Sequence, residues 1–160
     1  MGKVLHTFTN GYPGAVSRSI DNIIISLRNA SDGPIAFGAP VFLVSGEQAC
    51  RGFAAESSTA AQFLGFAVRA ADKTPDTYGS DTASYAKDDP VDILVRGSTV
   101  LHFANAATPG CSVYIRKSDG AVVTSAGAEG TTLQLPNVTV RTVRDGDRGA
   151  EVVITKRNVI

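Results

Sequence analysis

The chain has 160 residues, a length expected for one domain, and 43% of them are hydrophobic, which is enough to fill a single core. Its 15 lysines and arginines balance its 15 aspartates and glutamates, so no overall field concentrates nucleic acid or anionic lipid. The longest apolar runs, such as residues 22–25, are far shorter than the roughly 20 residues that a membrane helix needs. We therefore predict neither a nucleic acid nor a membrane as a partner.

Residues 1–20 keep neither the period of a strand nor that of a helix. This stretch contains His6, Phe8, Tyr12 and Pro13, so three aromatic rings lie within its first twelve residues. We interpret it as an extended N-terminal arm that becomes ordered on a partner. A loosely packed chain end is the alternative interpretation. Residues 21–160 are predicted to form a single β domain.

The first half of that domain contains short runs typical of strands. Strands are predicted at residues 21–28, 41–44, 50–55 and 63–70. The first run ends at a turn cluster over residues 29–34, and Pro40 suits the start of the second because no ladder donor is lost there. Gly65 is predicted to mark a bulge or a close approach between two backbones.

Residues 72–90 form the one long stretch without a pattern. Long loops inside a compact domain are usually either functional or disordered, so this polar loop is a second candidate contact region. Its candidate contact residues are Asp76, Tyr78 and Tyr85. The aspartates lack the spacing of a calcium-binding loop, which favours a solvated loop over a metal site.

The second half continues the strand pattern. Strands are predicted at residues 91–103 with a kink at Gly97, and then at 112–116, 121–124, 131–135, 138–143 and 151–154. Ser118, Asp119 and Gly120 supply the turn of a hairpin between the runs 112–116 and 121–124. About ten short strands separated by turns predict an all-β fold, an antiparallel sandwich or barrel.

The sequence offers little for catalysis. It contains no phosphate-binding loop, no dinucleotide-binding glycine motif and no nucleophile elbow. A nucleophile pair could only combine His102 with Cys50 or Cys111, and a solvent-facing strand histidine is the simpler interpretation of His102. With no export signal at the N-terminus, both cysteines are expected to be reduced. We predict no catalytic residue, no cofactor and no metal.

The order of several short segments resembles the structural cement, or head decoration, proteins of tailed bacteriophages. The segments are residues 29–41 with Pro34-Ile35 and Phe37-Gly38, residues 63–69, residues 89–97 ending in Arg96-Gly97, residues 109–114 before Asp119-Gly120, and residues 135–138 before a terminal strand pair. The resemblance spans residues 26–154. It implies a non-enzymatic β domain that binds the outer face of an assembled capsid and braces neighbouring major capsid subunits.

The resemblance also implies the partners. We expect the chain to bind the major capsid protein and itself, as a trimer or less favourably a dimer, because many moderate contacts on a symmetric lattice add up through avidity. It would be assembled in the bacterial cytoplasm and lie on the capsid surface. The candidate contact residues are His6, Phe8, Tyr12 and Pro13 in the arm and Asp76, Tyr78 and Tyr85 in the loop.

Two other classes of protein are alternatives. A tail-fibre or carbohydrate-binding β domain would use exposed aromatic platforms, and a chain with no tryptophan and four tyrosines has few of them. A small β-barrel hydrolase would need a pocket that holds His102 beside a carboxylate or a cysteine.

Overall fold

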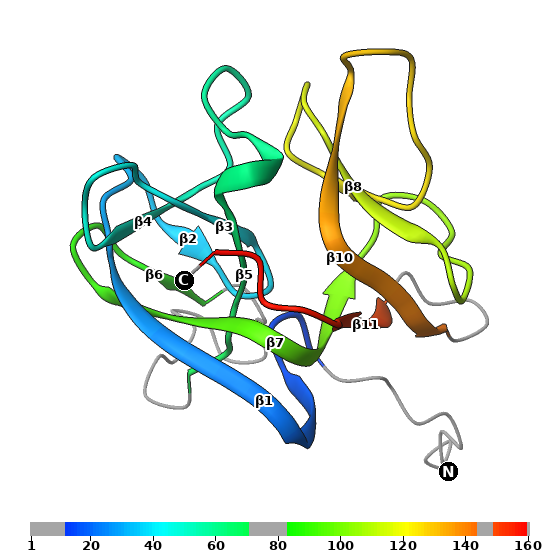
Figure 1. The fold of residues 1–160 in the computed structure, drawn as a ribbon, viewed down its shortest axis with the longest axis horizontal. Coiled ribbons are helices and arrows are strands. Elements are labelled where there is room, and N and C mark those ends of the chain that lie inside the picture. Colours follow the sequence, from blue (N-terminus) through cyan, green and yellow to red (C-terminus); the bar gives the residue numbers. More distant parts are fainter. Residues whose placement is uncertain (1–11, 71–82, 144–148, 160) are drawn as a thin grey trace, which may run out of the picture.

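The computed structural model describes residues 12–70, 83–143 and 149–159, and nearly all of its regular structure is β (Figure 1). The strands are β1 (Val16–Asn29), β2 (Ile35–Ala36), β3 (Pro40–Leu43), β4 (Ala49–Gly52), β5 (Phe63–Ala67), β6 (Ser84–Tyr85), β7 (Pro90–His102), β8 (Ser112–Arg116), β9 (Val122–Val123), β10 (Thr132–Val143) and β11 (Gly149–Ile154), with one 3₁₀ turn, η1 (Ala60–Gln62), in the described part of the chain. The predicted all-β class is confirmed. Over these residues the structure contains no helix of the length and apolarity needed to cross a membrane.

A closed ring of strands forms one half of the molecule. Strand β1 pairs with β4 through Arg28 and Asn29 and with β7 along most of its length, which closes β1, β4, β3, β5 and β7 into a small barrel. The β1–β4 pairing is parallel, whereas every other pairing described is antiparallel. The antiparallel barrel predicted from the sequence is therefore present, with one parallel closure.

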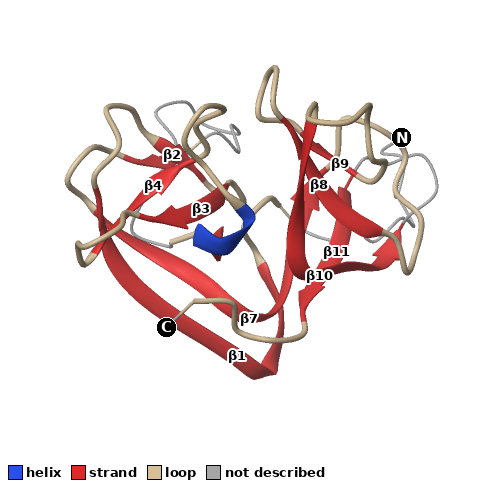
Figure 2. Ribbon diagram, turned by 45° about the horizontal axis from the view of Figure 1, so that its top comes forward, coloured by secondary structure: helices blue, strands red, loops and turns tan. Residues whose placement is uncertain are grey.

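The other half extends the same sheet from β7. Beyond the ring, β7 pairs with β11, and the sheet continues through β10, β8 and β9 to nine strands. Strands β2 and β6 form a separate pair. In Figure 1 the ring lies on the left, β8 and β10 stand on the right, and β7 passes from one to the other. Figure 2 shows β1 and β7 running together along the lower edge.

Several strands are longer than the sequence pattern predicts. Strand β1 begins at Val16, so residues 16–20 of the predicted arm belong to the sheet. The runs 131–135 and 138–143 form one strand, β10, whose pairing slips between Gln134 and Thr139 near Asn137, a residue with a φ of 59°. Such bulges interrupt the alternation of side chains without ending the strand. The short strands β2 and β6 were not predicted.

Alternate side chains of the shared strands face two different cores. In β3, Val41 packs inside the barrel with Leu64 and Ile93. The next residue, Phe42, packs on the outside, where it and Phe63 join the second core. That core is completed by residues of β7, β8, β10 and β11: Leu101, Val113, Ile115, Leu135, Val138, Val140, Ala150, Val152 and Ile154. Strand β5 is buried on both faces as a result.

Gly65 lies where β5 approaches the main chain of β7 closely. A Cβ atom at Gly65 would stand 1.9 Å from the carbonyl oxygen of Leu94, well inside van der Waals contact. The β3–β5 register also slips here, since Val41 faces Gly65 and the next residue, Phe42, faces Phe63. Both predictions for Gly65, a bulge and a close backbone approach, are confirmed.

Replacing Gly65 with alanine should destabilise the domain by about 3 kcal/mol, because the Leu94 carbonyl is backbone and can give way only if the strands separate. The expected result is a fall of roughly 10 °C in melting temperature. Gly33→Ala is the matched control, since no atom lies within 4 Å of a Cβ at Gly33. Equal melting temperatures for the two variants would contradict this account.

Candidate interaction site

The chain becomes part of the domain at Gly14. Its N–H donates to the carbonyl oxygen of Val100 (3.0 Å), and its own carbonyl accepts from the N–H of Arg69 (2.9 Å). A Cβ atom at Gly14 would lie 2.8 Å from the main-chain nitrogen of Gly38, and the φ of Gly14 is +76°. Only a glycine fits this crowded left-handed position, so the base of the predicted arm is fixed on the barrel.

Tyr12 stands at this base and is 60% exposed. The guanidinium carbon of Arg69 lies 5.0 Å from the centre of the Tyr12 ring and 5.5 Å from that of Phe37. This places one cation between two aromatic faces, a favourable electrostatic contact. Pro13 is half-buried beside it. Sequence reasoning missed Arg69, because nothing in the local pattern links residues so far apart in the chain.

A buried carboxylate on β11 ties the start of β1 to that strand across β7. Glu151 of β11 is 5% exposed and accepts hydrogen bonds from Ser17 Oγ (2.8 Å), Arg18 Nε (2.8 Å) and Thr142 Oγ1 (3.0 Å). Burial acts to raise the pKa of Glu151, but the hydrogen bonds from Arg18, Ser17 and Thr142 and the charge of Arg18 outweigh it and hold the pKa below its usual value. The ionised carboxylate therefore stabilises the fold.

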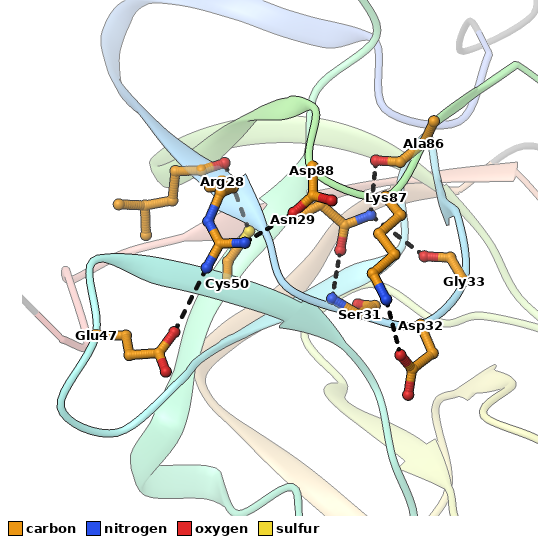
Figure 3. Close-up of polar contacts among 11 residues, drawn as sticks. Arg28, Asn29, Ser31, Asp32, Gly33, Glu47, Cys50, Ala86, Lys87 and Asp88 are labelled. Atoms are coloured by element: carbon orange, nitrogen blue, oxygen red, sulfur yellow. Dashed lines mark hydrogen bonds and ion pairs between the residues drawn. The ribbon is translucent and has the colours of Figure 1, made fainter.

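At its other end, β1 finishes in a buried polar residue. The side chain of Asn29 is fully buried, and its Nδ2 donates to the carbonyl oxygens of Gly33 (3.2 Å), Tyr85 (3.4 Å) and Ala86 (3.0 Å). Its Oδ1 accepts from the N–H of Ser31 (2.9 Å), which builds the predicted turn. Figure 3 shows the contacts of Asn29 with Ser31, Gly33 and Ala86. Asn29 thus holds the end of the predicted loop 72–90 against β1.

Exposed ion pairs surround that network in Figure 3. Arg28 lies 2.7 Å from Asp88 and 3.6 Å from Glu47, and Lys87 lies 3.1 Å from Asp32. Pairs this exposed contribute little to stability. They do give this end of the barrel a charged and hydrogen-bonded surface.

The structure describes three of the seven predicted contact residues. His6, Phe8, Asp76 and Tyr78 lie outside the described residues, whereas Tyr12 and Pro13 lie at the base of the arm. Tyr85 is 1% exposed: its hydroxyl donates to the carbonyl oxygen of Val68 (2.7 Å), and its ring meets Phe37 edge-on. In the isolated chain Tyr85 is therefore a core residue.

Among the described residues no hydrogen bond joins His102 to Cys50 or Cys111, the residues considered for catalysis. His102 ends β7 and is exposed to solvent, as predicted, and both cysteines are free. Cys50 is buried against the carbonyl oxygen of Leu27, and burial raises the pKa of its thiol to about 11. It stays protonated at neutral pH and is a poor nucleophile. In residues 12–70, 83–143 and 149–159 no three His, Cys, Asp or Glu side chains gather as a metal site.

The geometry defines an all-β protein. It contains a closed ring of strands, an N-terminal segment anchored on that ring, and polar loops at one end of the ring. The family profile of structural cement proteins (E217 gp24/Pam3 gp6) matches residues 3–156. The chain therefore belongs to this family of phage structural cement proteins, as the resemblance in the sequence implied.

A solved structure has the same fold. A chain from the structure entitled "The capsid of Myoviridae Phage XM1" aligns with a TM-score of 0.73 and 17% identity, covering 97% of this chain and 96% of that one. No curated protein sequence matches the chain. The family match does not favour the fibre or carbohydrate-binding alternative.

Replacing Glu151 with glutamine should lower the free energy of unfolding by about 2 kcal/mol at pH 7, since Arg18, Ser17 and Thr142 lose an ionised acceptor. The folded pKa lies below the unfolded value, about 4.3 for a glutamate. The contribution is therefore complete above that value and is lost as the pH falls through the folded pKa.

Urea denaturation from pH 7 down to pH 3 measures this difference. The gap between the wild type and Glu151→Gln should narrow as the pH falls, whereas Glu129→Gln, which changes an exposed glutamate, should match the wild type throughout. A gap that stays constant with pH would show that Glu151 acts through packing rather than charge.

Proposed function

We propose that this cement protein binds the outer surface of the assembled phage head and braces neighbouring major capsid subunits. The match of nearly the whole chain to the structural cement family carries this proposal. The distribution of exposed apolar side chains supports it. The four large hydrophobic side chains exposed among the described residues, those of Tyr12, Ile20, Ile23 and Ile24, all lie within residues 12–24.

We place the main contact at the N-terminal arm. Tyr12 and Pro13 stand where the arm meets the barrel, and His6 and Phe8 precede them in the sequence. Asp76 and Tyr78 in the loop form the second candidate contact. Tyr85 supports that loop from the core through its hydroxyl and its main chain. An anchored base limits the entropy that the arm loses when it binds.

The role is structural rather than enzymatic. We further propose that the chain acts as a homo-oligomer, a trimer in preference to a dimer. This oligomer is assembled in the host cytoplasm and joins the capsid there. Binding at a symmetry point multiplies moderate contacts, so no single tight site is needed.

The test measures mass and capsid binding together. Light scattering should give three times the chain mass of 16.6 kDa. Purified protein mixed with expanded, undecorated phage heads should sediment with them and saturate at a fixed ratio per capsid subunit. A folded protein that stays in the supernatant at all concentrations would overturn the proposed function.

Deleting residues 1–11 should abolish sedimentation with the heads and leave the melting temperature within a few degrees of the wild type. The cut falls before Tyr12, because removing residues 12–20 would also remove the bonds of Gly14, Ser17 and Arg18 to the domain. Full-strength binding by the truncated protein would refute the role of the arm. Loss of folding, seen by circular dichroism, would show a structural role for these residues instead.

A further inference from the structure

Three arginines from three strands line an open cleft on the face where β1 crosses β7. Arg18 comes from β1, Arg96 from β7 and Arg141 from β10. Asn22 and Ser98 lie between them on the lining of the cleft. No local sequence pattern indicated this cluster, since its members are separated by more than 40 residues.

The cationic groups of the cleft are only partly used. Arg18 binds Glu151 through Nε, yet its side chain is 55% exposed. Arg141 has one long contact, 3.5 Å from Nη1 to Ser98 Oγ. Arg96 is exposed, and its side chain makes no hydrogen bond or ion pair with any residue that the structure describes. Asp21 also lines the cleft, so three guanidinium groups face Asp21 and the already bonded Glu151.

The floor of the cleft is rigid. The Ser98 N–H donates to Asn22 Oδ1 (3.3 Å), and a Cβ atom at Gly97 would lie 1.9 Å from that same oxygen. Gly97 has a φ of +120°, which favours glycine, and the β1–β7 register slips between Arg18 and Ile23. The Asn22 side chain is therefore packed against the main chain of Gly97 and Ser98. The arginines on either side of it project from a fixed base.

Apolar side chains border the same cleft. Ile20 and Ile154 line it, and Ile20 is 95% exposed. Further along β1, outside the lining of the cleft, Ile23 and Ile24 are 38% and 45% exposed. Strand β1 pairs with β4 only at Arg28 and Asn29, so along residues 23–27 it has a described neighbour, β7, on one side alone. A strand edge that carries exposed isoleucines is suited to an extended polypeptide segment.

We propose that this cleft binds an acidic, extended segment of the major capsid protein, with a carboxylate between Arg96 and Arg141 and apolar side chains against Ile20. Guanidinium groups are suited to planar carboxylates, which they bind through paired hydrogen bonds. The inference rests on the proposed function and names a contact separate from the arm.

The charge of the cleft argues against a second copy docked on it about a two-fold axis. Two copies related by a two-fold axis present the same patch to each other. Three guanidinium groups would then face three more across the interface, and juxtaposed like charges disfavour such a contact. An acidic partner neutralises them instead.

The variant Arg96→Glu tests the cleft with little risk to folding, because the Arg96 side chain is exposed and bonds to no described residue. Its affinity for expanded, undecorated heads should fall at least about tenfold. Arg157→Glu changes the same charge at another exposed position, outside the cleft, and should bind like the wild type. Ile20→Ser should weaken binding by a few-fold without changing the melting temperature.

The outcomes separate this inference from the proposed function. Binding by the wild type and equally by Arg96→Glu would overturn the cleft and leave the cement role intact. Absence of binding by the wild type would overturn both. A smaller mass of Arg96→Glu by light scattering would show that a second copy occupies the cleft, contrary to the proposal.

Discussion

Strand β7 serves two hydrophobic cores at once, and the rest of the structure depends on this. Its first part closes the barrel with β1 and β5, and its last part pairs with β11. Residues such as Ile93 face the barrel interior, whereas Leu101 faces the second core. Because one continuous strand spans both halves, neither half can move as a separate unit without breaking a buried ladder.

Sharing strands between two cores requires close backbone contacts. Gly65 lets β5 lie against the Leu94 carbonyl, and Gly97 lets β7 turn past Asn22 where it leaves the barrel. Gly14 and Gly38 meet in the same way at the base of the arm. Each of these positions has no room for a side chain, so the glycines fix the distances between strands.

The packing of the strands also determines how β1 is presented at the surface. Glu151 of β11 binds the start of β1 across β7, and Asn29 ties the other end of β1 to residues 85 and 86. Strand β1 is consequently held at both ends while its middle exposes isoleucines along an edge. A protein that reinforces a lattice benefits from presenting its contacts on such a rigid support, because little order is lost on binding.

Local sequence pattern determined the β class, most strand positions, the hairpin around Asp119 and Gly120, and the special role of Gly65. These depend on neighbours in the chain: alternation, turn residues and the absence of a side chain. The order of turn and strand segments also indicated the cement family. The sequence alone placed candidate contacts at Tyr12 and Pro13, the first two residues that the structure describes.

Tertiary structure decided how the strands close and which polar groups meet. The parallel β1–β4 pairing, the joining of two predicted runs into β10 and the burial of Tyr85 depend on contacts between distant segments. The same holds for the Arg69 contact with Tyr12 and Phe37 and for the Arg18, Arg96 and Arg141 cleft. An isolated arginine in a sequence looks like any solvated charge, and only the register of strands brings three of them together.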